Sequence, residues 1–128
     1  MGIWSKAGKG AFMDKSALAK IVFDFIKETG GVSLVEVENI FRENGFDFSG
    51  DYMLAIPAVN IVMWADWNEE AVAIMKEVID MGAEFKSTSP LVYYYDGKAL
   101  NLPIARTAKG YKELHWIPVV LNVKEEAL

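Results

Sequence analysis

The sequence contains no cysteine and only one histidine, His115, among its 128 residues. Without cysteine there can be no disulfide, no thiolate metal site and no cysteine nucleophile. A lone histidine lacks the partners that a zinc site requires, so we expect His115 to be structural or solvent-facing and the protein to hold neither metal nor cofactor. The absence of cysteine also suits a reducing compartment, which favours a cytoplasmic location.

Motifs that bind phosphate or activate a nucleophile are also missing. The ten glycines form neither GxGxxG nor GxxxxGK[ST], and no serine stands in a GxSxG elbow. Glu69 and Glu70 are adjacent, and adjacent residues of a helix point apart, so this pair is better explained by the positive end of a helix. The sequence therefore predicts a protein that is not an enzyme and has no catalytic residue.

Long hydrophobic runs are absent as well. Asp66 and Glu69 interrupt the longest candidate, around residues 59–65, well short of the roughly 18 residues that a membrane span needs. We therefore expect no membrane partner. Residues 1–13 hold three glycines without periodicity and are interpreted as a flexible leader, and residues 125–128 as an acidic tail. Residues 14–124 are interpreted as one globular domain.

Acidic and basic side chains are unevenly distributed along the chain, whose net charge is −5. Residues 14–85 carry five basic and fourteen acidic side chains, whereas residues 86–124 carry six basic and two acidic ones. Such an asymmetry indicates two surfaces of opposite sign, although a solvated surface explains a run of charges equally well.

Three helices are predicted from apolar periodicity and from their end signals. The first covers residues 14–29, with Asp14 as its N-cap and glycines after it. The second begins at a capping box formed by Ser33 and Glu36. The third covers residues 68–81, begins at Asp66 or Asn68, and ends before a glycine.

Three extended segments are predicted. Residues 59–65 form an apolar, β-branched strand. Residues 91–102 form a tight β-hairpin that turns at Asp96 and Gly97, because Asp-Gly is the strongest short hairpin signal. In this register Tyr95 faces Lys98, and both Tyr93 and Tyr95 pack inward, which leaves only Tyr94 free. Residues 115–123 form a last strand, in which Pro118 requires an edge or a bulge.

Together these elements predict an α+β fold in which three helices pack on a small antiparallel sheet with a tight β-hairpin. The order of elements, the capping box at Ser33 and the turn at Gly97 resemble a winged-helix domain over about residues 14–105. The usual first strand of that family lies between the first and second helices, whereas the strand predicted here follows the second. The resemblance implies that the third helix enters the DNA major groove. That helix, however, carries Glu69, Glu70, Glu77 and Asp80 against Lys76 alone, which phosphates would repel.

Two functions follow as alternatives. The first is a small regulatory protein of winged-helix-like type, which contacts nucleic acid through the basic hairpin and the loop after it: Lys86, Lys98, Arg106, Lys109 and Lys112. The second is a protein-interaction or oligomerisation module that binds no nucleic acid. In that case the final strand would be an edge strand that pairs with a protein partner or with a second copy in a homodimer. Its candidate interface residues are Trp116, Val119 and Leu121.

Overall fold

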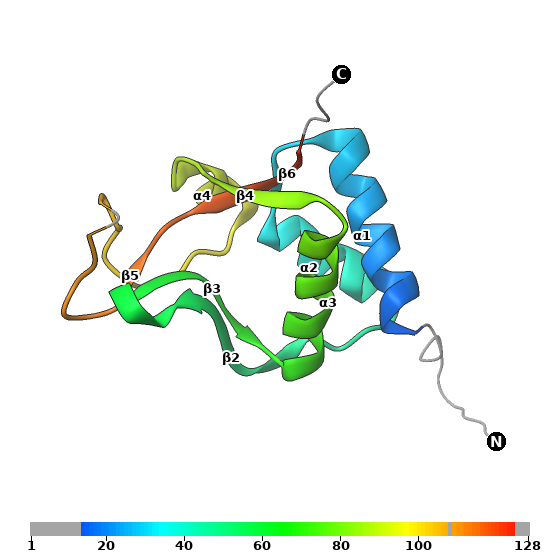
Figure 1. The fold of residues 1–128 in the computed structure, drawn as a ribbon, viewed down its shortest axis with the longest axis horizontal. Coiled ribbons are helices and arrows are strands. Elements are labelled where there is room, and N and C mark those ends of the chain that lie inside the picture. Colours follow the sequence, from blue (N-terminus) through cyan, green and yellow to red (C-terminus); the bar gives the residue numbers. More distant parts are fainter. Residues whose placement is uncertain (1–13, 108, 125–128) are drawn as a thin grey trace.

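The computed structural model describes residues 14–107 and 109–124, so the proposed leader and acidic tail lie outside the described residues. Figure 1 shows the long helices on one side of the molecule and an extended β-ribbon that reaches away from them. In chain order the elements are α1 (Lys15–Thr29), β1 (Val32–Ser33), α2 (Leu34–Glu43), β2 (Ser49–Ile56), the 3-10 helix η1 (Pro57–Val59), β3 (Ile61–Trp67), α3 (Glu69–Asp80), β4 (Ala83–Ser87), α4 (Leu91–Asp96), β5 (His115–Trp116) and β6 (Val119–Val123). The predicted α+β fold class is confirmed.

The three long helices begin where their capping residues predict. The Asp14 carboxylate accepts the Ala17 amide at 2.7 Å, which caps α1. At α2, the Ser33 hydroxyl accepts the Glu36 amide while the Glu36 carboxylate accepts the Ser33 amide, so both halves of the capping box are present. The cap of α3 is Asn68, one of the two residues predicted for it.

Sheet A is antiparallel with the order β1-β6-β4. Leu121 of β6 pairs with Val32 of β1 on one side and with Phe85 of β4 on the other. The predicted strand at residues 115–123 is divided into β5 and β6, which belong to different sheets. The prediction of an edge strand is wrong for β6, because β1 and β4 pair with its two edges within the chain. The short strand β1 lies between α1 and α2, where its two residues are too few to show a periodic pattern.

Sheet B contains β2, β3 and β5, with β2 antiparallel and β5 parallel to β3. The predicted strand at residues 59–65 corresponds to β3, although it begins at Ile61 and ends at Trp67. Its partner β2 was not predicted, and its pairing with β3 contains register shifts. The turn between the two strands uses η1 and Asn60, whose φ of 56° is in the left-handed region.

The predicted hairpin at residues 91–102 is wrong, because residues Leu91–Asp96 form the helix α4. Gly97 does have the positive φ that the prediction required, at 84°, but uses it to end a helix: its amide donates to the carbonyls of Tyr93 and Tyr94. Tyr95 consequently does not pair with Lys98 across a turn. The helical period turns Tyr93 into the core and leaves Tyr94 and Tyr95 exposed.

The core joins the helices to both sheets through large aromatic side chains. Trp64 and Trp67 are fully buried. The ring centroids of Trp64 and Tyr93 lie 5.0 Å apart, and those of Tyr93 and Trp116 lie 5.3 Å apart. Aromatic pairs at these separations add stability beyond the apolar area that they bury. Within residues 14–107 and 109–124, no helix has both the length and the apolar character needed to cross a membrane.

Candidate functional site

The five basic residues predicted to contact nucleic acid lie in three different places. Lys98 is turned inward and bonds to Glu38. Lys86 lies on β4 between Phe85 and Ser87, which face the pocket described below; because successive strand residues alternate, Lys86 faces the opposite side of sheet A. The remaining three, Arg106, Lys109 and Lys112, are exposed in residues 105–107 and 109–114, which we name the basic loop.

Tyr111 organises the basic loop from within. Its hydroxyl accepts hydrogen bonds from the backbone amides of Arg106 at 2.7 Å and Thr107 at 3.0 Å. Its ring stacks on the ring of His115, with centroids 3.7 Å apart and an interplanar angle of 11°. His115 thus has a structural contact with the loop. These contacts fix the backbone from which the basic side chains of the loop project.

The basic loop is also attached to the turn of the β2–β3 hairpin. The amide of Tyr111 donates to the carbonyl of Val59 at 3.1 Å, and the side-chain amide of Asn60 donates to the carbonyl of Tyr111 at 2.8 Å. Gly110 has a φ of 95°, and a Cβ there would lie 3.1 Å from the Cβ of Val59. The loop and the hairpin turn therefore form one end of the molecule, opposite α1, α2 and α3 (Figure 1).

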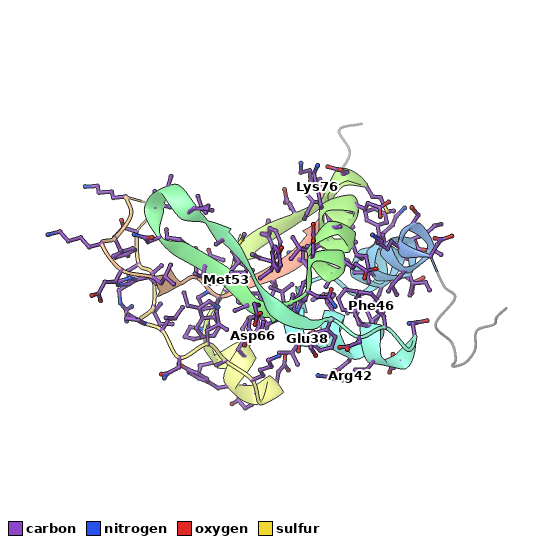
Figure 2. All side chains as sticks on the ribbon, turned by 90° about the horizontal axis from the view of Figure 1, so that it is seen from below. Glu38, Arg42, Phe46, Met53, Asp66 and Lys76 are labelled. Atoms are coloured by element: carbon purple, nitrogen blue, oxygen red, sulfur yellow. The ribbon has the colours of Figure 1, made fainter. Side chains whose placement is uncertain are left out.

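Glu38 is a fully buried carboxylate that sequence reasoning missed. Its Oε2 accepts the indole N–H groups of Trp64 and Trp67, each at 2.8 Å, and its two oxygens accept Lys98 Nζ at 2.8 and 2.9 Å. Arg42, one turn further along α2, lies 3.7 Å from Oε1 (Figure 2). Every bonding direction of this carboxylate is used within the chain, so it is a structural centre that joins α2, β3 and the segment after α4.

A sequence signal for Glu38 was present. Leu34 and Phe41 of α2 are buried, and Glu38 lies four positions after Leu34 and three before Phe41, which places it on the same helical face. A carboxylate on an apolar face needs partners, and tryptophan side chains bring a donor into the core. The pattern does not identify which donors those are, because they come from segments distant in the sequence.

The helix α4 is fixed to the N-terminal end of α2. The hydroxyl of Tyr93 accepts the amide of Leu34 at 3.1 Å and donates to the carbonyl of Val119. The Ser33 hydroxyl donates to the Asp96 carboxylate at 2.6 Å. Burial raises the pKa of the Tyr93 hydroxyl well above its ordinary value. These contacts hold α4 with Leu91, Tyr94 and Tyr95 directed to solvent.

The three predicted interface residues do not form a surface. Trp116 is 1% exposed, Val119 3% and Leu121 0%. Trp116 packs against Trp64 and Tyr93, and the other two face the core from the central strand of sheet A. The prediction of an interface at these positions is therefore wrong, because their side chains are almost entirely covered within the chain.

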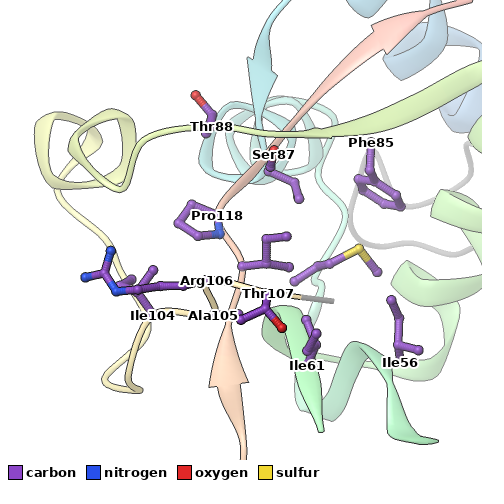
Figure 3. A pocket seen from close by; sticks show the side chains of 13 residues that line it. Ile56, Ile61, Phe85, Ser87, Thr88, Ile104, Ala105, Arg106, Thr107 and Pro118 are labelled. Atoms are coloured by element: carbon purple, nitrogen blue, oxygen red, sulfur yellow. The ribbon is translucent and has the colours of Figure 1, made fainter. Parts of the chain in front are cut away.

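A pocket of about 610 Å³ lies between the two sheets, next to the start of the basic loop (Figure 3). Both sheets contribute to its walls, which include Ile56 and Ile61 from the β2–β3 hairpin and Phe85 from β4. Among the described residues, no group of three or more acidic or histidine side chains is arranged to hold a metal ion. The charged group in the lining is Arg106.

Comparisons with known proteins do not extend this description. No family model matches the chain, and neither a curated protein nor a solved structure matches it.

Proposed function

We propose that this protein is a small non-enzymatic regulatory module of winged-helix-like type that contacts nucleic acid through its basic loop. The loop lies in the connection between β4 and β6, the antiparallel pair that follows the third long helix. In the family that the sequence resembles, this connection is the wing. Here it is enlarged to include α4, the basic loop and β5.

The position of β1 supports the winged-helix-like interpretation. The family has its first strand between the first and second helices, and β1 lies between α1 and α2. β1 also joins the same antiparallel sheet as β4 and β6. The departure noted in the sequence thus concerns an added hairpin, β2–β3, between the second and third helices.

The observation that carries the nucleic-acid proposal is the separation of charge between the two ends of the molecule. Arg106, Lys109 and Lys112 are exposed on a loop that Tyr111 holds at the end away from the helices. The helix α3 starts with Glu69 and Glu70 at the other end. A field of this kind orients a polyanion toward the basic end and keeps α3 away from phosphates.

The test is the salt dependence of binding to a short fluorescein-labelled DNA duplex, followed by fluorescence anisotropy. If all three cations contact phosphates, the logarithm of the association constant should fall against the logarithm of salt concentration with a slope of about −2.7. The triple variant Arg106→Ala/Lys109→Ala/Lys112→Ala should lose binding and the salt slope together.

A second triple variant, Lys15→Ala/Lys20→Ala/Lys27→Ala, is the matched control. It removes the same charge from α1, where all three side chains are exposed, and should bind like the wild type. Equal loss in both variants would mean that net charge alone governs binding. No binding by the wild type at low salt would overturn the nucleic-acid proposal and favour the interaction module.

One observation favours that alternative function, a protein-interaction module. α4 exposes 58% of Leu91, 58% of Tyr94 and 89% of Tyr95, although Tyr93 and Asp96 fix the helix to the core. Exposed aromatic side chains on a fixed element are typical of contact surfaces. Analytical ultracentrifugation over a range of concentrations tests self-association, and Tyr94→Ser/Tyr95→Ser should abolish any association that uses this helix.

A further inference from the structure

The pocket between the sheets has the size and lining of a small-molecule site, and this feature goes beyond the proposed nucleic-acid contact. Its volume of about 610 Å³ falls within the ~300–1,000 Å³ of typical ligand pockets. Figure 3 draws the side chains of the 13 residues that line it. Four of these are isoleucines and one is an aromatic residue, so the walls fit a flexible aliphatic body better than a flat ring.

The polar residues of the lining come from two segments of the chain. Ser87 and Thr88 follow one another at the end of β4, and Arg106 and Thr107 follow one another at the start of the basic loop. Figure 3 shows the guanidinium of Arg106 beside Ile104, on the outer side of the pocket and away from Phe85. A ligand with its apolar part against Phe85 and Ile61 would therefore direct a polar head toward this rim.

The charge of the lining selects an anionic head. None of the lining residues is acidic, although the whole chain has a net charge of −5. Arg106 forms no ion pair with any carboxylate in the described part of the chain. Its guanidinium offers donors that match a carboxylate.

One lining residue, Ile56, leaves apolar surface accessible at the pocket. Ile56 is 49% exposed, although it lies beside Ile61, which is 4% exposed. An aliphatic body in the pocket would cover the side chain of Ile56 and remove apolar surface from water. We propose that the pocket binds a small amphipathic carboxylate with an aliphatic body, of the medium-chain fatty acid type, with its head at Arg106.

The isoleucine methyl groups of the wild-type protein give a direct test. Sodium decanoate is titrated into isoleucine-methyl-labelled protein, and binding with a dissociation constant below about 1 mM is expected. The methyl signals of Ile56, Ile61, Ile104 and Ile117 should shift with decanoate. The isoleucines of α1, α2 and α3 are the internal control and should stay unchanged: Ile21, Ile26, Ile40, Ile74 and Ile79.

Two tryptophan variants on the same strand test the location. Ser87 is an exposed residue of β4 that lines the pocket, so Ser87→Trp places a large side chain into it. This variant should abolish the shifts of the isoleucine methyl signals with decanoate. Lys86→Trp introduces the same side chain on the opposite face of β4 and should retain them, even though it removes a positive charge. Circular dichroism confirms that both variants fold; if Ser87→Trp does not fold, the methyl map of the wild type decides the location by itself.

The head group is tested with ligands that share one chain length. Decan-1-ol and decyltrimethylammonium carry the same aliphatic body with a neutral and a cationic head. Arg106→Gln should weaken the binding of decanoate about threefold, as expected for loss of an exposed ion pair, and should leave the affinity for decan-1-ol unchanged. Binding of the cation as tightly as decanoate would overturn the assignment of an anionic head.

Absence of decanoate binding to the wild type, or shifts spread evenly over the helical isoleucines, would overturn the pocket proposal. Arg106 belongs to both this proposal and the basic loop, so a further variant separates them. Lys109→Ala/Lys112→Ala should weaken DNA binding and leave the decanoate affinity unchanged. Loss of decanoate binding in that variant would contradict the assignment of the head to Arg106.

Discussion

Lys98 reaches the fully buried carboxylate of Glu38, with its Nζ 2.8 and 2.9 Å from the two carboxylate oxygens and 60 positions between the residues in sequence. The lysine follows α4, whereas the glutamate lies in the middle of α2. Burying a carboxylate costs free energy that only good partners offset. The pair therefore fixes where the connection between β4 and β6 rests on the helical body.

We expect Lys98→Met to destabilise the protein by about 3 kcal/mol, because Glu38 would remain buried with its main counter-charge removed. Glu38→Gln should cost less, since the 38% exposed side chain of Lys98 can return to water. Urea unfolding of both variants and of the double variant measures the coupling. Lys86→Met, at an exposed lysine of β4, is the control, and an equal effect of the two lysine variants would contradict the prediction.

The pH dependence of stability should report on Tyr93. Burial raises the pKa of this hydroxyl above its ordinary value of 10.0, so the folded state keeps a proton that the unfolded state releases. Its contribution to stability is therefore complete below about pH 10 and falls as the pH rises further, by about 1.4 kcal/mol per pH unit. Urea unfolding in alkaline buffers should show this slope in the wild type and its loss in Tyr93→Phe.

At neutral pH, Tyr93→Phe should also lower the free energy of unfolding by about 2 kcal/mol, because the amide of Leu34 and the carbonyl of Val119 lose their partner. Tyr94→Phe is the matched control, since that hydroxyl belongs to an exposed side chain. Equal stability of the two variants would show that water replaces the lost hydroxyl.

Two glycines should respond to alanine for different reasons. At Gly97 a Cβ would meet no atom within 4 Å, so only the positive φ of 84° disfavours alanine there. We therefore expect Gly97→Ala to lower the free energy of unfolding by about 1 kcal/mol. At Gly50 a Cβ would lie 2.6 Å from the Cα of Asn68, which is backbone and cannot turn aside. Gly50→Ala should therefore lower the free energy of unfolding by more, about 3 kcal/mol. Thermal unfolding of the two variants measures the difference.

Gly97→Asn distinguishes the two causes, because asparagine tolerates the left-handed conformation better than alanine does. It should be more stable than Gly97→Ala. If Gly97→Asn were less stable than Gly97→Ala, the size of the side chain, and not the backbone conformation, would determine which residues this position tolerates.

Hydrogen exchange should identify β6 as the most protected strand. Its two edges are paired with β1 and β4 inside one chain, so its paired amides open only with the sheet. Protection should not depend on protein concentration. If these amides become protected only at high concentration, the strand would be completed by a second copy, as the sequence had suggested.

The sequence by itself determined the elements whose signals are local. Asp14, Ser33 and Glu36 cap their helices through atoms three residues away, so neighbouring residues suffice to locate them. The apolar run before Trp67 likewise predicted a strand, because β-branched residues fit a pleated, buried segment. The α+β class follows from these elements alone.

Local reasoning failed at Asp96 and Gly97 because one backbone property serves two structures. A positive φ at glycine is required both by a type I′ turn and by the end of a helix. The choice depends on Tyr93, whose hydroxyl joins Leu34 to Val119, and on Asp96, which bonds Ser33. These partners are 26 to 63 positions away, so no window of sequence contains them.

The tertiary structure also decided which residues of the candidate sites can contact a partner or a ligand. Composition gave the basic character of residues 86–124, but only the fold directs Lys98 to Glu38 and leaves Arg106, Lys109 and Lys112 on the basic loop. The pocket is likewise made by residues of both sheets, from Ile56 to Val119. A buried charge takes whichever partner the packing brings within hydrogen-bond distance, and long-range packing fixes that partner only when the whole chain is folded.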